Sequence, residues 1–134
     1  MAIDGGLDEG QPAPADAAAL GDAPRIRAYL TQAARGGRSV SYSELLGELG
    51  FRFTRPKMRS LCRTLERVDQ LCAADGEPDL AVLVVRESDG LPGQGWWVGG
   101  TPLLLGYVGP WDGAGAAQFI REQQDAVFAF WAAG

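Results

Sequence analysis

The clearest pattern in the chain is the helical spacing of apolar residues between Thr54 and Ala74. These residues recur at intervals of three and four, which predicts an amphipathic helix with one buried face. They are Met58, Leu61, Cys62, Leu65, Val68 and Cys72. Thr54 is a suitable N-cap and Pro56 suits the first helical turn, while Asp75-Gly76 is expected to end the helix.

Two shorter helices are predicted before it. Asp22 can cap the first, which Gly36-Gly37 should end. Ser41 begins the second and is followed three residues later by Glu44, the spacing of a capping box. Gly50 can adopt the left-handed conformation that stops this helix.

The second half of the chain changes its pattern. Residues 80–85 are continuously apolar and rich in valine, which predicts a strand covered on both faces. Residues 86–90 are typical of a hairpin turn, and 91–98 would return as a second strand. Residues 103–108 are a further candidate for a short strand, and 116–132 have the spacing of a final helix. The expected fold is α/β (α+β) and winged-helix-like: three N-terminal helices, a β-hairpin wing and an additional C-terminal helix.

Composition divides the chain into two parts. Residues 1–21 are rich in Gly, Ala, Pro and Asp, which predicts a disordered acidic leader before a single domain over 22–134. No apolar run approaches the roughly 20 residues that cross a bilayer. The N-terminus is acidic where a secretory signal needs positive charge, so a cytoplasmic protein without membrane contact is expected.

Charge is unevenly distributed along the chain. The formal net charge is −5, yet residues 25–67 hold ten basic and three acidic residues, a net +7. The remaining residues hold two basic and fourteen acidic ones, a net −12. A basic segment inside an acidic chain can present a local positive face to phosphates.

The second and third predicted helices have the layout of a helix-turn-helix, and double-stranded DNA is therefore the predicted partner. Arg55 and Lys57 lie in the first turn of the third helix, where base edges are read. Arg52, Arg63 and Arg67 are better placed for phosphates, and Arg59 for either. Tyr42 and Ser43 could add neutral phosphate donors. The candidate DNA-binding residues are Tyr42, Ser43, Arg52, Arg55, Lys57, Arg59, Arg63 and Arg67.

The segment Val40-Ser-Tyr-Ser-Glu-Leu-Leu46 resembles the opening of the DNA-binding domain of O6-alkylguanine-DNA alkyltransferases and alkyltransferase-like proteins. The similarity continues loosely through Arg55 to Leu61 and into Val84-Val85 and Asp89-Gly90, about 50 residues in all. It implies a winged helix that binds DNA, with Tyr42 contacting the backbone beside a flipped nucleotide. Either Arg55 or Arg59 could match the arginine finger of that family.

The chain departs from the family at the reactive position. Where the family has Pro-Cys-His-Arg, this chain has Leu80-Ala-Val-Leu83, so the acceptor cysteine is missing. The chain also contains no histidine, which removes Ser-His-Asp and Cys-His nucleophiles and the usual histidine-containing zinc sites. A non-catalytic DNA-binding module is therefore expected, with no catalytic residue, metal or cofactor.

An enzyme remains an alternative. Five acidic residues between 75 and 89 could surround a magnesium ion, as in a restriction-type nuclease. They are Asp75, Glu77, Asp79, Glu87 and Asp89. Asp89 stands where such a core has its lysine, so these acids more simply cap and solubilise turns.

A protein-interaction or inhibitory accessory module is the other alternative. Trp96 and Trp97 would point to opposite faces of a strand, one into the core and the other out at the wing. The final helix carries more aromatic residues than one face needs, so it either closes the core or forms a homodimer seam. The candidate partner-binding residues are Trp96, Trp97, Phe128 and Trp131.

Overall fold

A computed structural model describes residues 18–99 and 101–132 of the protein. Three helices build the first half of the chain. They are α2 (Ala23–Arg35), α3 (Tyr42–Glu48) and α4 (Arg55–Ala74). The predicted N-caps are confirmed. In each case the side chain of the capping residue accepts a hydrogen bond from the backbone amide three residues later, at 2.9–3.2 Å. The pairs are Asp22 with Arg25, Ser41 with Glu44, and Thr54 with Lys57.

The helices also end where the sequence indicates. Gly50 follows α3 with a φ of 93°, and Gly76 follows α4 with a φ of 71°. Most of the predicted leader, residues 1–17, lies outside the described residues. Leu20 packs against the core and its carbonyl accepts a hydrogen bond from Thr64, so the folded region begins before Asp22.

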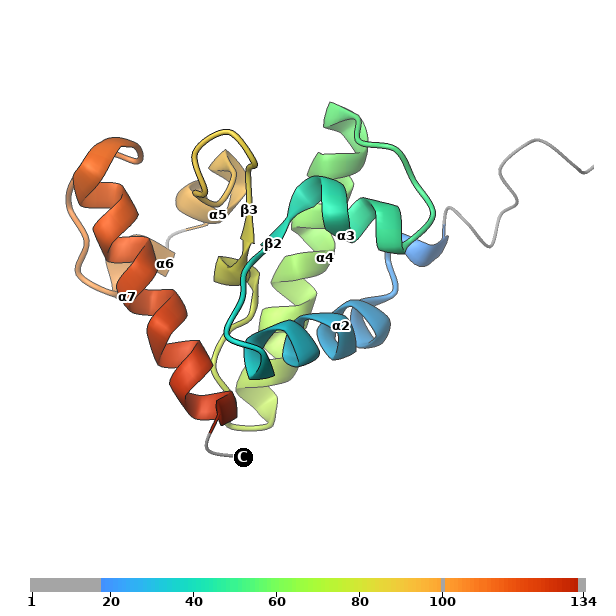
Figure 1. Ribbon diagram of the computed structural model, residues 1–134, viewed down its shortest axis with the longest axis horizontal. Helices are drawn as coiled ribbons and strands as arrows, with labels where there is room; N and C mark the ends of the chain where they lie inside the picture. Colours follow the sequence, from blue (N-terminus) through green and yellow to red (C-terminus); the bar gives the residue numbers. More distant parts are fainter. Residues whose placement is uncertain (1–17, 100, 133–134) are drawn as a thin grey trace, which may run out of the picture.

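A short parallel sheet joins the two halves of the chain. Strand β2 (Val40–Ser41) pairs with β3 (Val84–Val85), with Val40 opposite Val84 and Ser41 opposite Val85. The two strands lie between α7 on one side and α3 and α4 on the other (Figure 1). Buried aliphatic side chains from both halves form one core around them, including Leu30, Leu61 and Ile120.

Residues 80–85 are buried as predicted, but most of them are not extended. Ala81–Leu83 form a 3₁₀ turn, η1, and only Val84 and Val85 belong to a strand. All six side chains are at most 6% exposed. A continuous apolar run indicates that the segment is buried on all sides, but it does not determine whether the backbone is extended. Here the segment forms a tight turn that is buried between α4 and α7.

The predicted return strand over residues 91–98 is wrong. This segment instead forms a turn followed by helix α5 (Gln94–Val98), so the described residues contain no β-hairpin wing, and the winged-helix arrangement is not confirmed. The candidate strand at 103–108 is also wrong, since α6 (Thr101–Leu104) leads into a loop there. The final helix is confirmed as α7 (Gly113–Ala132).

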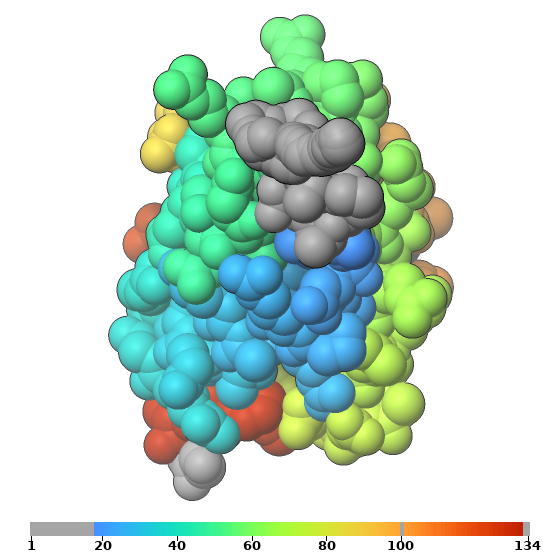
Figure 2. All heavy atoms as spheres, turned by 90° about the vertical axis from the view of Figure 1, so that its right-hand side faces the viewer, coloured from blue at the N-terminus to red at the C-terminus, as the bar shows by residue number. Residues whose placement is uncertain are grey.

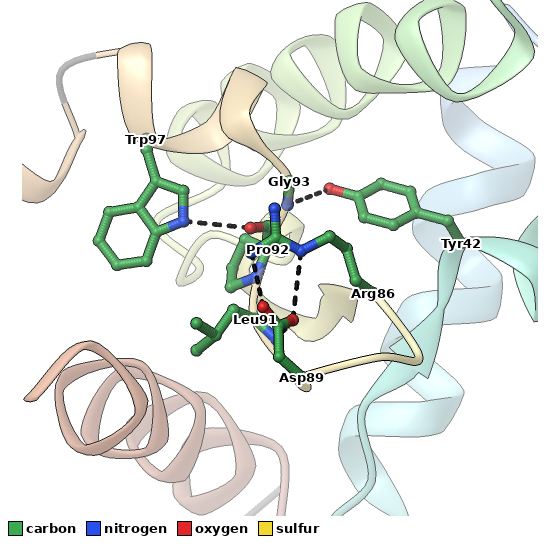
Figure 3. A network of polar contacts seen from close by, with 7 residues as sticks. All are labelled: Tyr42, Arg86, Asp89, Leu91, Pro92, Gly93 and Trp97. Atoms are coloured by element: carbon green, nitrogen blue, oxygen red, sulfur yellow. Dashed lines mark hydrogen bonds and ion pairs between the residues drawn. The ribbon is translucent and has the colours of Figure 1, made fainter. Parts of the chain in front are cut away.

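Contacts with α3 and α4 explain why residues 91–98 do not extend as a strand. The amide of Gly93 donates to the buried hydroxyl of Tyr42 at 2.9 Å, and the indole of Trp97 donates to the Pro92 carbonyl at 3.1 Å (Figure 3). A Cβ at Gly93 would lie 2.6 Å from Met58 Cε and 3.0 Å from the Tyr42 oxygen. The glycine therefore allows a close approach that a side chain would obstruct.

The helix α7 closes the core on the opposite side. Ala116, Ile120 and Val127 are buried, and Gln124 donates to the Val82 carbonyl at 3.0 Å. The helix also packs against α2, and the Arg35 guanidinium lies 5.2 Å from the centre of the Trp131 ring. Figure 2 shows α2 in blue across the middle of one face, with the end of α7 in red below it. None of the described helices is long and apolar enough to span a membrane.

Substituting Tyr42→Phe should test the contact that holds α5 in place. The change preserves the ring but leaves the buried amide of Gly93 without an acceptor, which should lower the free energy of unfolding by about 1–3 kcal/mol. Urea unfolding followed by circular dichroism measures this loss.

Tyr107→Phe is the matched control, because the Tyr107 hydroxyl donates to the Pro110 carbonyl in an exposed loop where water can replace it. The control should change stability much less. Equal losses in the two variants would mean that the Tyr42–Gly93 bond has no special role.

Candidate nucleic-acid interface

A row of four arginines follows the exposed side of α4. Because the residues repeat every fourth position, they lie on one side of the helix, opposite the buried Leu61, Leu65 and Val68. The row consists of Arg55, Arg59, Arg63 and Arg67, all exposed. None of the four takes part in an ion pair within the described part of the chain. Their charges are therefore available to an external anion.

The arginine row borders a groove of about 990 Å³. One wall is α4, and the other is formed by the turn after β3 and by α5. The lining residues are Tyr42, Ser43, Phe53, Arg55, Met58, Arg59, Cys62, Arg63, Glu66, Arg86, Glu87, Ser88, Gln94, Gly95 and Val98. The structure thus brings together three of the predicted arginines with Ser43.

Arg86 lies on the wall opposite the arginine row and was not predicted as a site residue. Its Nε and Nη2 donate to the two carboxylate oxygens of Asp89 at 3.2 and 2.8 Å (Figure 3). Asp89 Oδ1 also accepts from the Leu91 amide at 3.1 Å, which closes the turn. The guanidinium keeps the pKa of Asp89 below its usual value. The forked pair fixes the position of Arg86 but also compensates part of its charge.

Tyr42 is removed from the candidate contact residues. Its side chain is 3% exposed, and its hydroxyl already accepts from Gly93. Burial is the main cause of a strongly raised pKa of this phenol. A hydroxyl enclosed in this way supports the groove from beneath and is not presented to a phosphate. Cys62, half-buried beside it, forms part of the same floor.

The other predicted basic residues lie outside the groove lining. Arg52 is exposed in the loop before α4, and Arg67 extends the row by one helical turn. The ammonium of Lys57 lies 5.1 Å from the centre of the Phe51 ring. This cation–π contact directs Lys57 toward Phe51. These three residues therefore add to the positive field around the groove rather than to its wall.

A second, smaller cavity of about 280 Å³ shares part of the groove floor. Both cavities are lined by Tyr42, Cys62, Glu66 and Gly95. The smaller one adds carboxylates from Asp69 and Asp79, together with Trp96 and Ala81.

Asp69 was also not predicted as a site residue. One of its oxygens accepts hydrogen bonds from the amides of Leu80 and Ala81, both at 2.9 Å, and so fixes η1 to α4. Burial, followed by the nearby charge of Asp79, raises its pKa to about 7 despite these two donors. The sequence could have indicated that Asp69 is buried. It lies four residues after Leu65 and three before Cys72, which places it on the buried stripe of the helix.

The five acidic residues that the nuclease hypothesis places around a magnesium ion do not form one cluster. Asp75 and Glu77 both pair with Arg27, at 2.6 and 2.7 Å, and Asp89 pairs with Arg86. Across residues 18–99 and 101–132, no group of three potential ligands could hold a metal ion. The geometry thus gives the nuclease alternative no magnesium site in this part of the chain.

The aromatic residues predicted to bind a partner pack mainly within the protein. Trp97 is 3% exposed and lies edge-on to Trp96, with ring centres 5.0 Å apart. Trp96, Phe128 and Trp131 are partly buried against the core. The prediction that one tryptophan is in the core is confirmed for Trp97. The prediction that the other is exposed at a wing is wrong, because Trp96 is partly buried and both lie on α5 rather than on a strand.

Comparison with known proteins yields no relative: no family model matches the chain, and neither a curated protein nor a solved structure shows significant similarity to it.

Asp69→Asn should alter how stability depends on pH. A carboxyl group whose pKa is raised on folding binds its proton more tightly in the folded state. Its contribution is therefore lost as pH rises from about 4, the usual value for an aspartate, to about 7. Asparagine retains an oxygen for the Leu80 and Ala81 amides and does not titrate. The stability of the variant relative to the natural protein should increase between pH 4 and pH 8.

Urea unfolding of both proteins at several pH values measures this difference. Asp125→Asn, at an exposed position on α7, is the control and should follow the natural protein. Parallel profiles for the Asp69 variant and the natural protein would contradict the raised pKa.

Proposed function

We propose that the protein is a non-catalytic DNA-binding module that holds DNA phosphates along the arginine row of α4. The observation that carries the proposal is the exposed row itself, free of ion pairs in the described residues and bordering a groove. Guanidinium groups bind phosphate with charge and directed hydrogen bonds together.

The placement of the acidic residues supports the same proposal. The chain has a net charge of −5, and a uniform distribution would repel DNA. Several carboxylates pair instead with arginines away from the row. Glu44 pairs with Arg38 at 2.9 Å, and Asp75 with Arg27 at 2.6 Å. The positive field along α4 is therefore preserved although the molecule is acidic as a whole.

The resemblance to alkyltransferase DNA-binding domains supports DNA as the ligand of the proposed function but does not support the chemistry of that family. Ala81 supplies no thiol, and Cys62 lies on the groove floor with a raised pKa caused mainly by burial. A thiol of raised pKa is a poor nucleophile because little thiolate is present at neutral pH. Alkyl transfer is therefore not part of the proposed function.

A second candidate function rests on a different surface. Several large apolar side chains on α6 and in the loop after it are 43–88% exposed. They are Leu103, Leu104, Leu105, Val108 and Trp111. Contiguous exposed apolar residues are typical of protein-binding surfaces, so an interaction module, including a homodimer, would use this region rather than the tryptophans predicted from the sequence.

Removing arginines from the row should weaken DNA binding and its dependence on salt. Arg59→Ala and Arg63→Ala should each lower affinity for a labelled duplex, and each should reduce the slope of log affinity against log salt by about 1. Fluorescence anisotropy at several salt concentrations measures both quantities.

Arg121→Ala is the matched control, since Arg121 is an exposed arginine on α7, away from the groove. It should leave the affinity and the slope unchanged. Duplex affinity that does not respond to salt or to either groove substitution would refute the DNA-binding proposal, whereas an apolar protein interface would show little salt dependence.

A further inference from the structure

The groove beside the arginine row combines cations with exposed apolar side chains. Phe53 is 42% exposed and Val98 is 59% exposed, and they lie in the same lining as Arg55, Arg59 and Arg63. Met58 is partly buried on the floor below. Phosphate groups can bind the arginines but not the apolar side chains. The apolar part of the lining therefore points to a ligand that also carries apolar faces.

Intact duplex DNA does not expose such faces. Its bases are stacked on one another, and a protein reaches only their edges in the grooves. An unpaired strand exposes the flat faces of its bases beside its phosphates, and aromatic side chains can stack on them. The mixed lining therefore fits an unpaired strand better than a paired one.

The layout of the groove is compatible with a bound strand. It has two walls, with α4 on one side and Arg86, Ser88 and Gln94 on the other. A single strand lying along α4 would face both walls and cover Met58. Successive arginines of the row are about 6 Å apart along the helix axis, at 1.5 Å rise per residue. That spacing is comparable to the distance between neighbouring phosphates along a nucleic-acid strand, whether paired or unpaired.

The charge of the lining does not separate the two forms of DNA. Four arginines and two glutamates, Glu66 and Glu87, leave a net charge of +2, and the pairing of Arg86 with Asp89 compensates part of it. A net positive lining attracts both duplex and single-stranded DNA. The exposed apolar side chains therefore carry the distinction between them.

We propose that this groove binds an unpaired segment of a DNA strand, with phosphates along Arg55, Arg59 and Arg63 and a base stacked on Phe53. The inference rests on the proposed function and narrows its ligand from DNA in general to DNA with an unpaired stretch. Ser88 and Gln94 supply neutral hydrogen-bonding groups on the facing wall.

Anisotropy titrations with three labelled probes test the inference: a thymidine strand of about fifteen nucleotides, a blunt duplex of similar length, and the corresponding uridine RNA strand. The thymidine strand should bind more tightly than the duplex. Phe53→Ala should weaken strand binding about 5- to 150-fold, the effect of losing one stacked base, and change duplex binding little. Val98→Ser should weaken strand binding less.

Phe130→Ala is the matched control, because Phe130 is 45% exposed on α7 and does not line the groove. Circular dichroism establishes that each variant is folded. Duplex binding as tight as strand binding, or strand binding unaffected by Phe53→Ala, overturns the inference while leaving the proposed function intact. Tighter binding of the uridine strand overturns the assignment to DNA. No salt-dependent binding of any probe refutes the proposed function itself.

Discussion

The close approach of residues 91–98 to α3 and α4 is the constraint on which the groove depends. Tyr42 accepts the Gly93 amide in the interior, and a Cβ at Gly95 would lie only 3.3 Å from Cys62 Cβ. These two glycines allow α5 to lie against α4 with little space between their backbones. The second wall of the groove follows from this contact, because Gln94 and Val98 belong to α5. Without it, α4 would present a row of arginines on an open surface.

Ion pairing determines which arginines remain available. Arg27 pairs with Asp75 and Glu77, and Arg86 with Asp89, so these cations connect segments of the fold. The arginines of α4 have their helical neighbours at positions three and four away occupied largely by other arginines or by uncharged residues. Glu66, three residues after Arg63, is the one acidic residue at these positions, so pairs within the helix cannot neutralise the row of four arginines. The chain is therefore acidic as a whole and basic along one edge.

The sequence predicts the features of this fold that depend on neighbouring residues. The caps at Asp22, Ser41 and Thr54 and the arginine row of α4 depend on spacings of three or four residues, which helical geometry fixes. Residues 80–98 could not be predicted in the same way, because an apolar run and a glycine-rich segment are compatible with either a hairpin or a turn and a helix. The parallel pairing of Val40 with Val84 and the approach of Gly93 to Tyr42 are contacts over more than 40 residues. For the same reason Tyr42 was assigned to the surface, and the role of Arg86 was missed.

The carboxylates near the groove floor would orient a bound strand. Glu66 lines both cavities, and Asp69 and Asp79 line only the smaller one. Phosphates are repelled from this end and attracted by the arginines of α4, so the backbone of a strand would follow the arginine wall. A base carries no net charge, and its exocyclic amine or, in thymine, its ring N–H can donate to a carboxylate, so the bases would face the floor. In a bound strand, the arginines on one side of the floor and the carboxylates on the other would therefore place the backbone and the bases on different sides, which a uniformly basic groove would not do.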